Sequence, residues 1–304
     1  QRVFDYSKAV DGLRQVLWGL FKKIVIADNC AEYANEIFNH SAAYSGSTLL
    51  LGALFFSFQI YCDFSGYSDI ALGTARLFGV DLLRNFAFPY FSRDIAEFWR
   101  RWHISLSTWF RDYLYIPLGG SKGGTLMKVR NTFIIFLVSG FWHGANWTFI
   151  IWGALNAIYF LPSLLRNKNR DNLGTVAAGK YLPTLKELMN MGITFALTVF
   201  AWIFFRAESV TQAFQYIRTI FSRSLFTMPD SMAFAHSQNN FLIMILLLLF
   251  FIIIEWIGRE RQYAIAGIGL KLPRMLRWGF YFFFFFLMAM YFLTSGSAFI
   301  YFQF

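Results

Sequence analysis

The chain has 304 residues, of which 57% are hydrophobic, 21% are aromatic and only 14% are charged. Soluble domains contain about 25% charged residues, so this composition excludes an ordinary soluble domain and indicates a membrane protein. The net charge of +10 does not indicate nucleic-acid binding, because the basic residues lie in loops between apolar segments, where orientation determinants belong.

The beginning of the chain is polar, and its first apolar element contains two lysines. The stretch QRVFDYSKAV is not a signal peptide and lacks an initial Met, so we expect a fragment without its earlier spans. In residues 13–29, Lys22 and Lys23 lie at the middle. Lysines that face lipid are costly, so we expect a re-entrant or interfacial helix here. Residues 29–47 contain no Lys or Arg and are predicted to be external.

Long uncharged windows further along the chain predict membrane crossings, since a span needs about 20 apolar residues. Residues 76–130 contain nine Lys and Arg, so we place them in the cytoplasm, as a cytoplasmic or interfacial helical segment. The loops 166–186 and 258–277 are also basic and are predicted to be cytoplasmic. The charge bias then predicts crossings at about 48–70, 187–205, 241–257 and 278–293.

Residues 131–165 lie between two cytoplasmic loops, so this segment must enter the membrane and return. Its 35 residues correspond to about 52 Å of helix, which is too little for two full spans of about 30 Å each. We expect either a turn at GFWHGAN within the membrane or two short arms. A broken backbone at that depth is tolerated where it lines a cavity, which would place His143 at the bottom of one.

His143 is an ionisable residue in an apolar segment, and such a residue indicates a function. The alternative is a neutral histidine that forms a hydrogen bond across a helix interface. A second candidate, His103, recurs with Trp99 and Ser107 at intervals of four residues, which predicts one helix face. Its segment, 97–120, alternates tryptophans with arginines, as an interfacial helix also does.

The remaining polar residues indicate structural roles. Asp63 and Asp69 are six residues apart, so a helix would place them on different faces, and we expect a structural pairing with Arg76 or another buried cation. Cys30 and Cys62 form neither a disulfide framework nor a metal-binding spacing. No metal site is predicted.

Five stretches together resemble the membrane-bound O-acyltransferase family. The two long ones are FWRRWHISLSTWFRDYLYIPLGG and GFWHGANWTFIIWG; the others are FQIYCDFSGYSDIALG, LFKKIVIADN and the terminal FIYFQF. The branch resembled is that of the bacterial alginate O-acetylation membrane protein, with D-alanyl-lipoteichoic acid transferases more distant. The resemblance runs from about residue 4 to the end. It implies one membrane-embedded domain over residues 1–304 and an all-α polytopic fold, with a ring of tilted and broken helices around a funnel.

The resemblance also implies an activity and a location. The expected protein is a multi-pass enzyme of the bacterial inner membrane, which moves an acetyl group from a cytoplasmic thioester, such as acetyl-coenzyme A, across the membrane. The acetyl group would pass to extracytoplasmic acetyltransferase partners that modify an exported polysaccharide. No bound cofactor and no nucleic acid are expected.

Within this family His143 matches the essential histidine, and His103 matches the second one. We expect His143 to act as general base, since imidazole is the usual base at neutral pH, and His103 to hold the donor or assist proton transfer. Trp142 and Asn146 would shape the pocket of His143. The anionic donor would face Trp102, Arg100, Arg101, Arg111 and Lys122.

Three alternatives stay open at this stage. The first is an enzyme that transfers D-alanine to a cell-envelope polymer. The second is a transporter or channel that uses His143 and the intramembrane aspartates. The third is a non-catalytic scaffold.

Overall fold

The structure is a computed structural model, which describes residues 4–229, 238–270 and 272–292. Within these ranges the regular elements are all helices, and four of them are long and apolar enough to cross a membrane, so the predicted all-α polytopic fold is confirmed. The terminal FIYFQF lies outside the described residues. The chain divides into two compact units, residues 1–87 with 226–303 and residues 88–225, which are described separately. The predicted single domain and ring of helices stay predictions.

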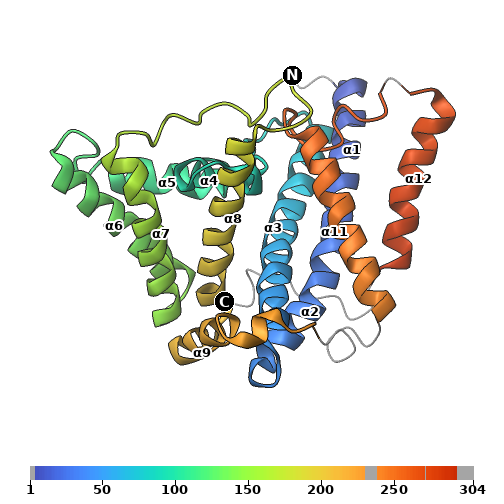
Figure 1. Cartoon of the computed structure of the whole chain (residues 1–304). Helices are drawn as coiled ribbons and strands as arrows, with labels where there is room; N and C mark the ends of the chain where they lie inside the picture. The colour runs from blue at the N-terminus through green and yellow to red at the C-terminus, as the bar shows by residue number, and fades with distance from the viewer. Residues whose placement is uncertain (1–3, 230–237, 271, 293–304) are drawn as a thin grey trace. The chain divides into compact units, whose positions relative to one another are not determined.

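The first unit begins with a helix that packs closely against α3 (Figure 1). This helix consists of α1 (Tyr6–Phe21), the π-helix η1 (Lys22–Ala27) and α2 (Asp28–Asn39), without interruption. The short η2 (Ser41–Ala43) leads to α3 (Gly46–Leu77). A Cβ on Gly19 would lie 2.6 Å from the carbonyl oxygen of Gly66, so only glycine permits this approach of the two backbones.

The two lysines of η1 form ion pairs inside the first unit. Nζ of Lys22 lies 2.6 Å from Asp69, and Nζ of Lys23 lies 2.7 Å from Asp63 and 2.8 Å from Asp28. The structural pairing expected for at least one of the two aspartates is therefore observed, since Asp69 pairs with the buried Lys22, and Asp63 also pairs with a lysine, the half-buried Lys23. The element is a continuous helix whose two lysines are neutralised by carboxylates, so it does not turn back as a re-entrant helix would, while its interfacial position stays a prediction.

The first unit is completed by α11 (Gln238–Gly258) and α12 (Arg274–Met290). The Tyr61 hydroxyl donates to Glu255 of α11 at 2.6 Å, which joins this helix to α3. The predicted crossings at 48–70 and 241–257 correspond to α3 and α11. A crossing was predicted at 278–293, and the structure has α12 there. This helix has 17 residues, fewer than the roughly 20 that a full span needs. Both cysteines are buried and free.

The second unit contains short helices followed by a hairpin and a long apolar helix. The short elements are η3 (Pro89–Phe91), α4 (Ile95–Arg101), α5 (Ile104–Phe110) and the π-helix η4 (Arg111–Tyr115). They are followed by α6 (Thr125–His143), α7 (Trp147–Leu165), α8 (Leu185–Arg206), α9 (Val210–Ile220) and η5 (Arg223–Phe226). In Figure 1, α4 and α5 run across the direction of α8. The predicted crossing at 187–205 corresponds to α8.

Helices α6 and α7 form the predicted hairpin, and its turn lies at Gly144–Asn146, within GFWHGAN. Each arm has 19 residues, because α6 begins at Thr125 and not near residue 131. The arms are therefore about 28 Å long, which is longer than the two arms that 35 residues would allow. A Cβ on Gly140 would lie 2.3 Å from the carbonyl oxygen of Phe149, so the glycine lets the two helices approach each other. The depth of the turn in a bilayer stays a prediction.

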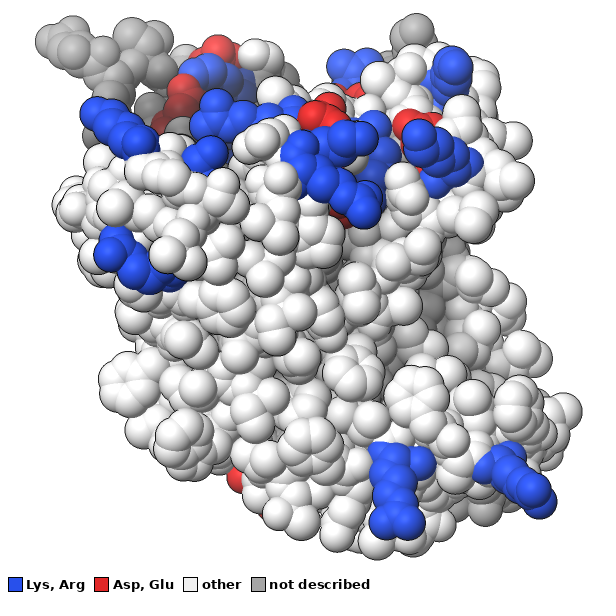
Figure 2. Space-filling view, turned by 60° about the vertical axis from the view of Figure 1, so that its left-hand side comes forward, with Lys and Arg blue, Asp and Glu red and all other residues white. Residues whose placement is uncertain are grey.

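Charge is unevenly distributed over the surface. On the face in Figure 2, Lys and Arg gather near the upper edge, a broad band below them is uncharged, and a few basic residues lie at the lower edge. An uncharged band between charged edges is the surface that a bilayer requires.

Candidate active site

The first wall of the candidate site is formed around a break between α4 and α5. Helix α4 ends at Arg101, and His103 has a left-handed backbone with φ of 44°. Asn, Asp and His are the side chains that tolerate this conformation best. The single helix face expected from the spacing of Trp99, His103 and Ser107 is therefore interrupted at His103. All three residues nevertheless line the same cavity.

One face of α6 forms the opposite wall. Thr132, Phe136, Ser139 and His143 follow one another at intervals of three or four residues, which places them on one side of the helix. This face extends over about 16 Å, since it covers 11 residue steps at about 1.5 Å each. His143 is the last residue of α6, one turn beyond Ser139.

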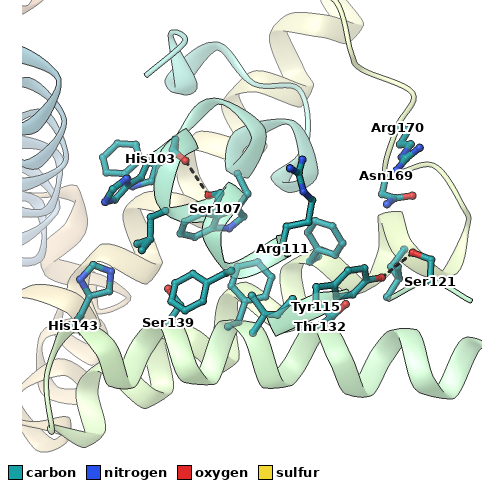
Figure 3. Close-up of a pocket in the computed structure, with 18 residues that line it drawn as sticks. His103, Ser107, Arg111, Tyr115, Ser121, Thr132, Ser139, His143, Asn169 and Arg170 are labelled. Atoms are coloured by element: carbon teal, nitrogen blue, oxygen red, sulfur yellow. Dashed lines mark hydrogen bonds between the residues drawn. The ribbon is translucent and has the colours of Figure 1, made fainter. Parts of the chain in front are cut away.

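The two walls enclose a cavity of about 240 Å³ within the second unit (Figure 3). Its polar lining residues come from α5, η4, α6 and two loops: His103, Ser107, Arg111, Tyr115, Ser121, Thr132, Ser139, His143, Asn169 and Arg170. In Figure 3, His143 lies at one end, and Ser121, Asn169 and Arg170 lie at the other. We call Arg111, Asn169 and Arg170 the basic end of the cavity.

His143 is surrounded by aromatic rings. The rings of Trp152 and Phe205 lie 5.3 Å and 5.0 Å from its imidazole, both edge to face. Large aromatic side chains in this arrangement restrict the orientation of the imidazole and exclude water from one side of it. His103 is also largely buried, and burial lowers the pKa of its imidazole to about 4. The His103 side chain is therefore neutral at physiological pH.

Polar contacts hold the loop at the other end of the cavity. The Asn131 amide donates to the carbonyl oxygens of Leu118 at 3.2 Å and Gly120 at 3.1 Å. The hydroxyls of Tyr115 and Ser121 lie 3.0 Å apart. The glycine-rich loop 119–124 is thus fixed to α6 near Ser121.

The structure brings together some of the residues expected at the site. His143, His103, Trp102 and Arg111 line the cavity, although Arg111 also forms an ion pair with Asp112 at 2.7 Å. The two histidines are 40 residues apart in the sequence, and the fold places them around one space.

The other expected residues lie outside the cavity lining. The Trp142 ring contacts His143 at 4.9 Å but is half exposed. Asn146 caps α7 by accepting from the Thr148 N–H at 3.1 Å, and it donates to the carbonyl of Glu208 at 3.0 Å. Lys122 is exposed on its loop.

Arg100 and Arg101 contact the backbone of the loop between α7 and α8 and do not line the cavity.

Several lining residues were not expected from the sequence. Thr132 and Ser139 share the helical periodicity of His143, and that periodicity was a signal that could have found them. Asn169 and Arg170 carry no such signal, because they lie in an irregular loop whose path depends on distant contacts. Among the described residues there is no group of three His, Cys, Asp or Glu that could hold a metal ion.

Comparison with known proteins places these features in a family. The profile of the membrane-bound O-acyltransferase family matches residues 5–204. A probable alginate O-acetylase AlgI of Pseudomonas aeruginosa is 43% identical over 221 residues, which cover 73% of this chain and 40% of the relative. A peptidoglycan O-acetyltransferase of Helicobacter pylori is 42% identical over 70% of this chain and 39% of the relative. A teichoic acid D-alanyltransferase of Streptococcus thermophilus is 37% identical over 51% of this chain and 40% of the relative. The chain thus spans about 40% of the length of these relatives.

Proposed function

Because the chain belongs to the membrane-bound O-acyltransferase family, we propose that its cavity is the site where an acyl group leaves a thioester donor. The observation that supports this most directly is the convergence of His103 and His143 on one cavity whose far end is basic. A general base at one end and cationic groups at the other are suited to an anionic thioester and a hydroxyl acceptor.

His143 acts as the general base in the proposed reaction. Its imidazole removes the proton of the acceptor hydroxyl while the oxygen attacks the thioester carbonyl carbon. The tetrahedral intermediate then breaks its carbon–sulfur bond, and the thiolate that leaves takes the proton from the imidazolium. The products are an oxygen ester and a thiol, so no oxidant or reductant is needed. The aromatic rings around His143 keep water away from the reacting carbonyl.

His103 faces the same space from the opposite wall and supports the donor. Since its imidazole is neutral, one ring nitrogen can donate a hydrogen bond to the thioester carbonyl as negative charge develops on that oxygen. The left-handed backbone at His103 directs the side chain into the cavity, where a residue in a continuous helix would follow the helix face.

The printed names of the relatives support a proposal for the donor and the acceptor. Two of them are named as O-acetylating proteins of alginate or peptidoglycan, so we propose an acetyl donor such as acetyl-coenzyme A and an exported or cell-envelope polysaccharide acceptor. Delivery would occur across the bacterial inner membrane to extracytoplasmic acetyltransferase partners. The D-alanyltransferase relative supports a second candidate, transfer of D-alanine to a cell-envelope polymer.

The test uses the purified protein in lipid nanodiscs with isotope-labelled acetyl or D-alanyl thioesters and a hydroxyl acceptor. We expect transfer from one donor class and a loss of about 10²–10⁴-fold in His143→Ala, the usual contribution of a general base. His40→Ala is the matched control, because His40 is exposed in the first unit. Normal transfer by His143→Ala at wild-type protein levels would show that His143 is not the base.

A further inference from the structure

The loop between α7 and α8 contributes Asn169 and Arg170 to the cavity, and it has no helix or strand of its own. An irregular loop presents a side chain in one place only when other groups hold its backbone. The contacts that hold this loop come from α4 and its N-terminal flank.

Arg100 makes the most direct of these contacts. Its two terminal guanidinium nitrogens donate to two carbonyl oxygens of the loop, those of Asn169 and Asn172, the latter at 2.9 Å. Asn169 immediately precedes Arg170, so Arg100 holds the backbone at the residue before the one that lines the cavity. Lysine could not replace this planar fork, because its single nitrogen cannot reach both carbonyls in the same geometry.

Further side chains anchor the next residues of the loop. Arg93 and Arg101 donate to the carbonyl of Gly174 at 2.7 Å and 2.9 Å, and both form ion pairs with the buried Glu97. The Asn172 amide donates to Asp94 at 2.6 Å. The loop is therefore attached to α4 from residue 169 to residue 174.

Two arginines line the cavity, Arg111 and the exposed Arg170, and their charges differ in how they are paired. Arg93 and Arg101 share Glu97, and Arg111 is paired with Asp112. Within the described part of the chain, Arg170 forms no ion pair with any carboxylate, although it lines the cavity. Burial lowers the pKa of the nearby Arg100 guanidinium, the carboxylates of Asp94 and Glu97 raise it, and the charges of Arg101 and Arg170 lower it by less. The charge of Arg170 therefore acts on Arg100, and an anion bound to Arg170 would offset that charge.

We propose that Arg100 is a positioning residue, which holds the loop so that Arg170 binds a phosphate group of the acyl donor at the basic end of the cavity. This inference rests on the proposed function. The cavity follows α6 for about 16 Å from Thr132 to His143, and Arg170 lies at the end opposite His143 in Figure 3. The donor must therefore separate its thioester from that phosphate by a distance of this order. A pantetheine arm is long enough to separate the two groups, on coenzyme A or on a carrier protein, whereas acetyl phosphate is too short.

The test measures binding by isothermal titration to the protein in lipid nanodiscs, so it does not require turnover. The probes are coenzyme A, phosphopantetheine and pantetheine, which share the arm and differ in phosphate. For Arg170→Ala we expect about a tenfold weaker coenzyme A affinity and unchanged pantetheine affinity, as for one charge-assisted hydrogen bond. A loss for both phosphate-bearing probes assigns the contact to the phosphate beside the arm, and a loss for coenzyme A alone assigns it to the nucleotide. Lys168→Ala is the control, because Lys168 is exposed and does not line the cavity.

The positioning role is tested by a double-mutant cycle. Arg100→Lys should weaken coenzyme A binding several-fold alone and add little in the Arg170→Ala background, because it acts through Arg170. If Arg100→Lys does not fold, Asn172→Ala loosens the same loop and takes its place in the cycle. The proposal would be overturned if the two substitutions weakened coenzyme A binding by factors that multiply, or if they weakened pantetheine binding as much as coenzyme A binding. Phosphate-dependent binding without transfer activity would instead overturn the proposed function and leave the positioning role intact.

Discussion

The close contact between α6 and α7 can be tested by one substitution, because it depends on Gly140, which has no Cβ. In Gly140→Ala the new Cβ would lie 2.3 Å from the carbonyl oxygen of Phe149 and 3.0 Å from its carbonyl carbon. Ordinary contacts are longer by roughly 1 Å, and a backbone carbonyl cannot rotate away as a flexible side chain can. The helices must separate, and overpacking of this kind costs about 1–3 kcal/mol. His143 lies three residues further along α6 and would move with the helix.

The assay compares the unfolding temperature and acyl-transfer rate of Gly140→Ala with those of Gly192→Ala. A Cβ on Gly192, in α8, would meet no atom within 4 Å, and alanine is the better helix former, so this control should be neutral or slightly stabilised. For Gly140→Ala we expect a decrease of about 2–12 °C, from about 2–4 °C per kcal/mol in a unit of this size, together with reduced transfer. An unfolding temperature equal to that of the control would refute the close-packing argument.

Three further substitutions test the surroundings of the cavity. Glu97 is 1% exposed and paired with two arginines, so Glu97→Ala should reduce stability by about 3–5 kcal/mol, whereas Asp112→Ala, which removes an exposed pair, should leave the unfolding temperature unchanged. Burial lowers the pKa of His103 to about 4, so as the pH decreases its imidazole takes up a proton in the unfolded chain before it does so in the folded protein. The stability of the folded protein should therefore fall as the pH decreases from about 6.5 to about 4. His103→Asn, which tolerates the left-handed backbone, should reduce the difference in unfolding temperature between neutral and acidic pH; an unchanged difference would contradict the assignment. Asn146→Ala should cost about 1 kcal/mol through the lost helix cap, and Asn146→Ser, which restores the cap, should recover most of the unfolding temperature.

The apolar elements could be predicted because their signals are local. The crossings by α8 and α11 follow from uncharged windows of sufficient length, and that by α3 from an apolar window with only two aspartates. The hairpin turn follows from Gly144 and Asn146, which end one helix and cap the next. The arm lengths were predicted less well, because α6 begins at Thr125, inside the basic stretch 76–130 that charge counting assigned to the cytoplasm.

The charged residues were harder to predict, since a sequence shows that a charge is present but not which group neutralises it. Lys22 and Lys23 indicated a re-entrant or interfacial helix, because the sequence does not show that Asp69 and Asp63 lie beside them. Arg100 was expected to face a donor, yet its guanidinium contacts loop carbonyls that are 69 and 72 residues away in the sequence.

The sequence by itself determined that this protein is helical, crosses a membrane and carries His143 at a helix turn, because apolar length and turn residues act over a few neighbouring positions. Only the tertiary structure decided that His103 turns into the same cavity and that Arg170 reaches its other end. Those positions depend on a left-handed residue at a helix break and on a loop held by distant side chains, and such contacts leave no periodic signal along the chain.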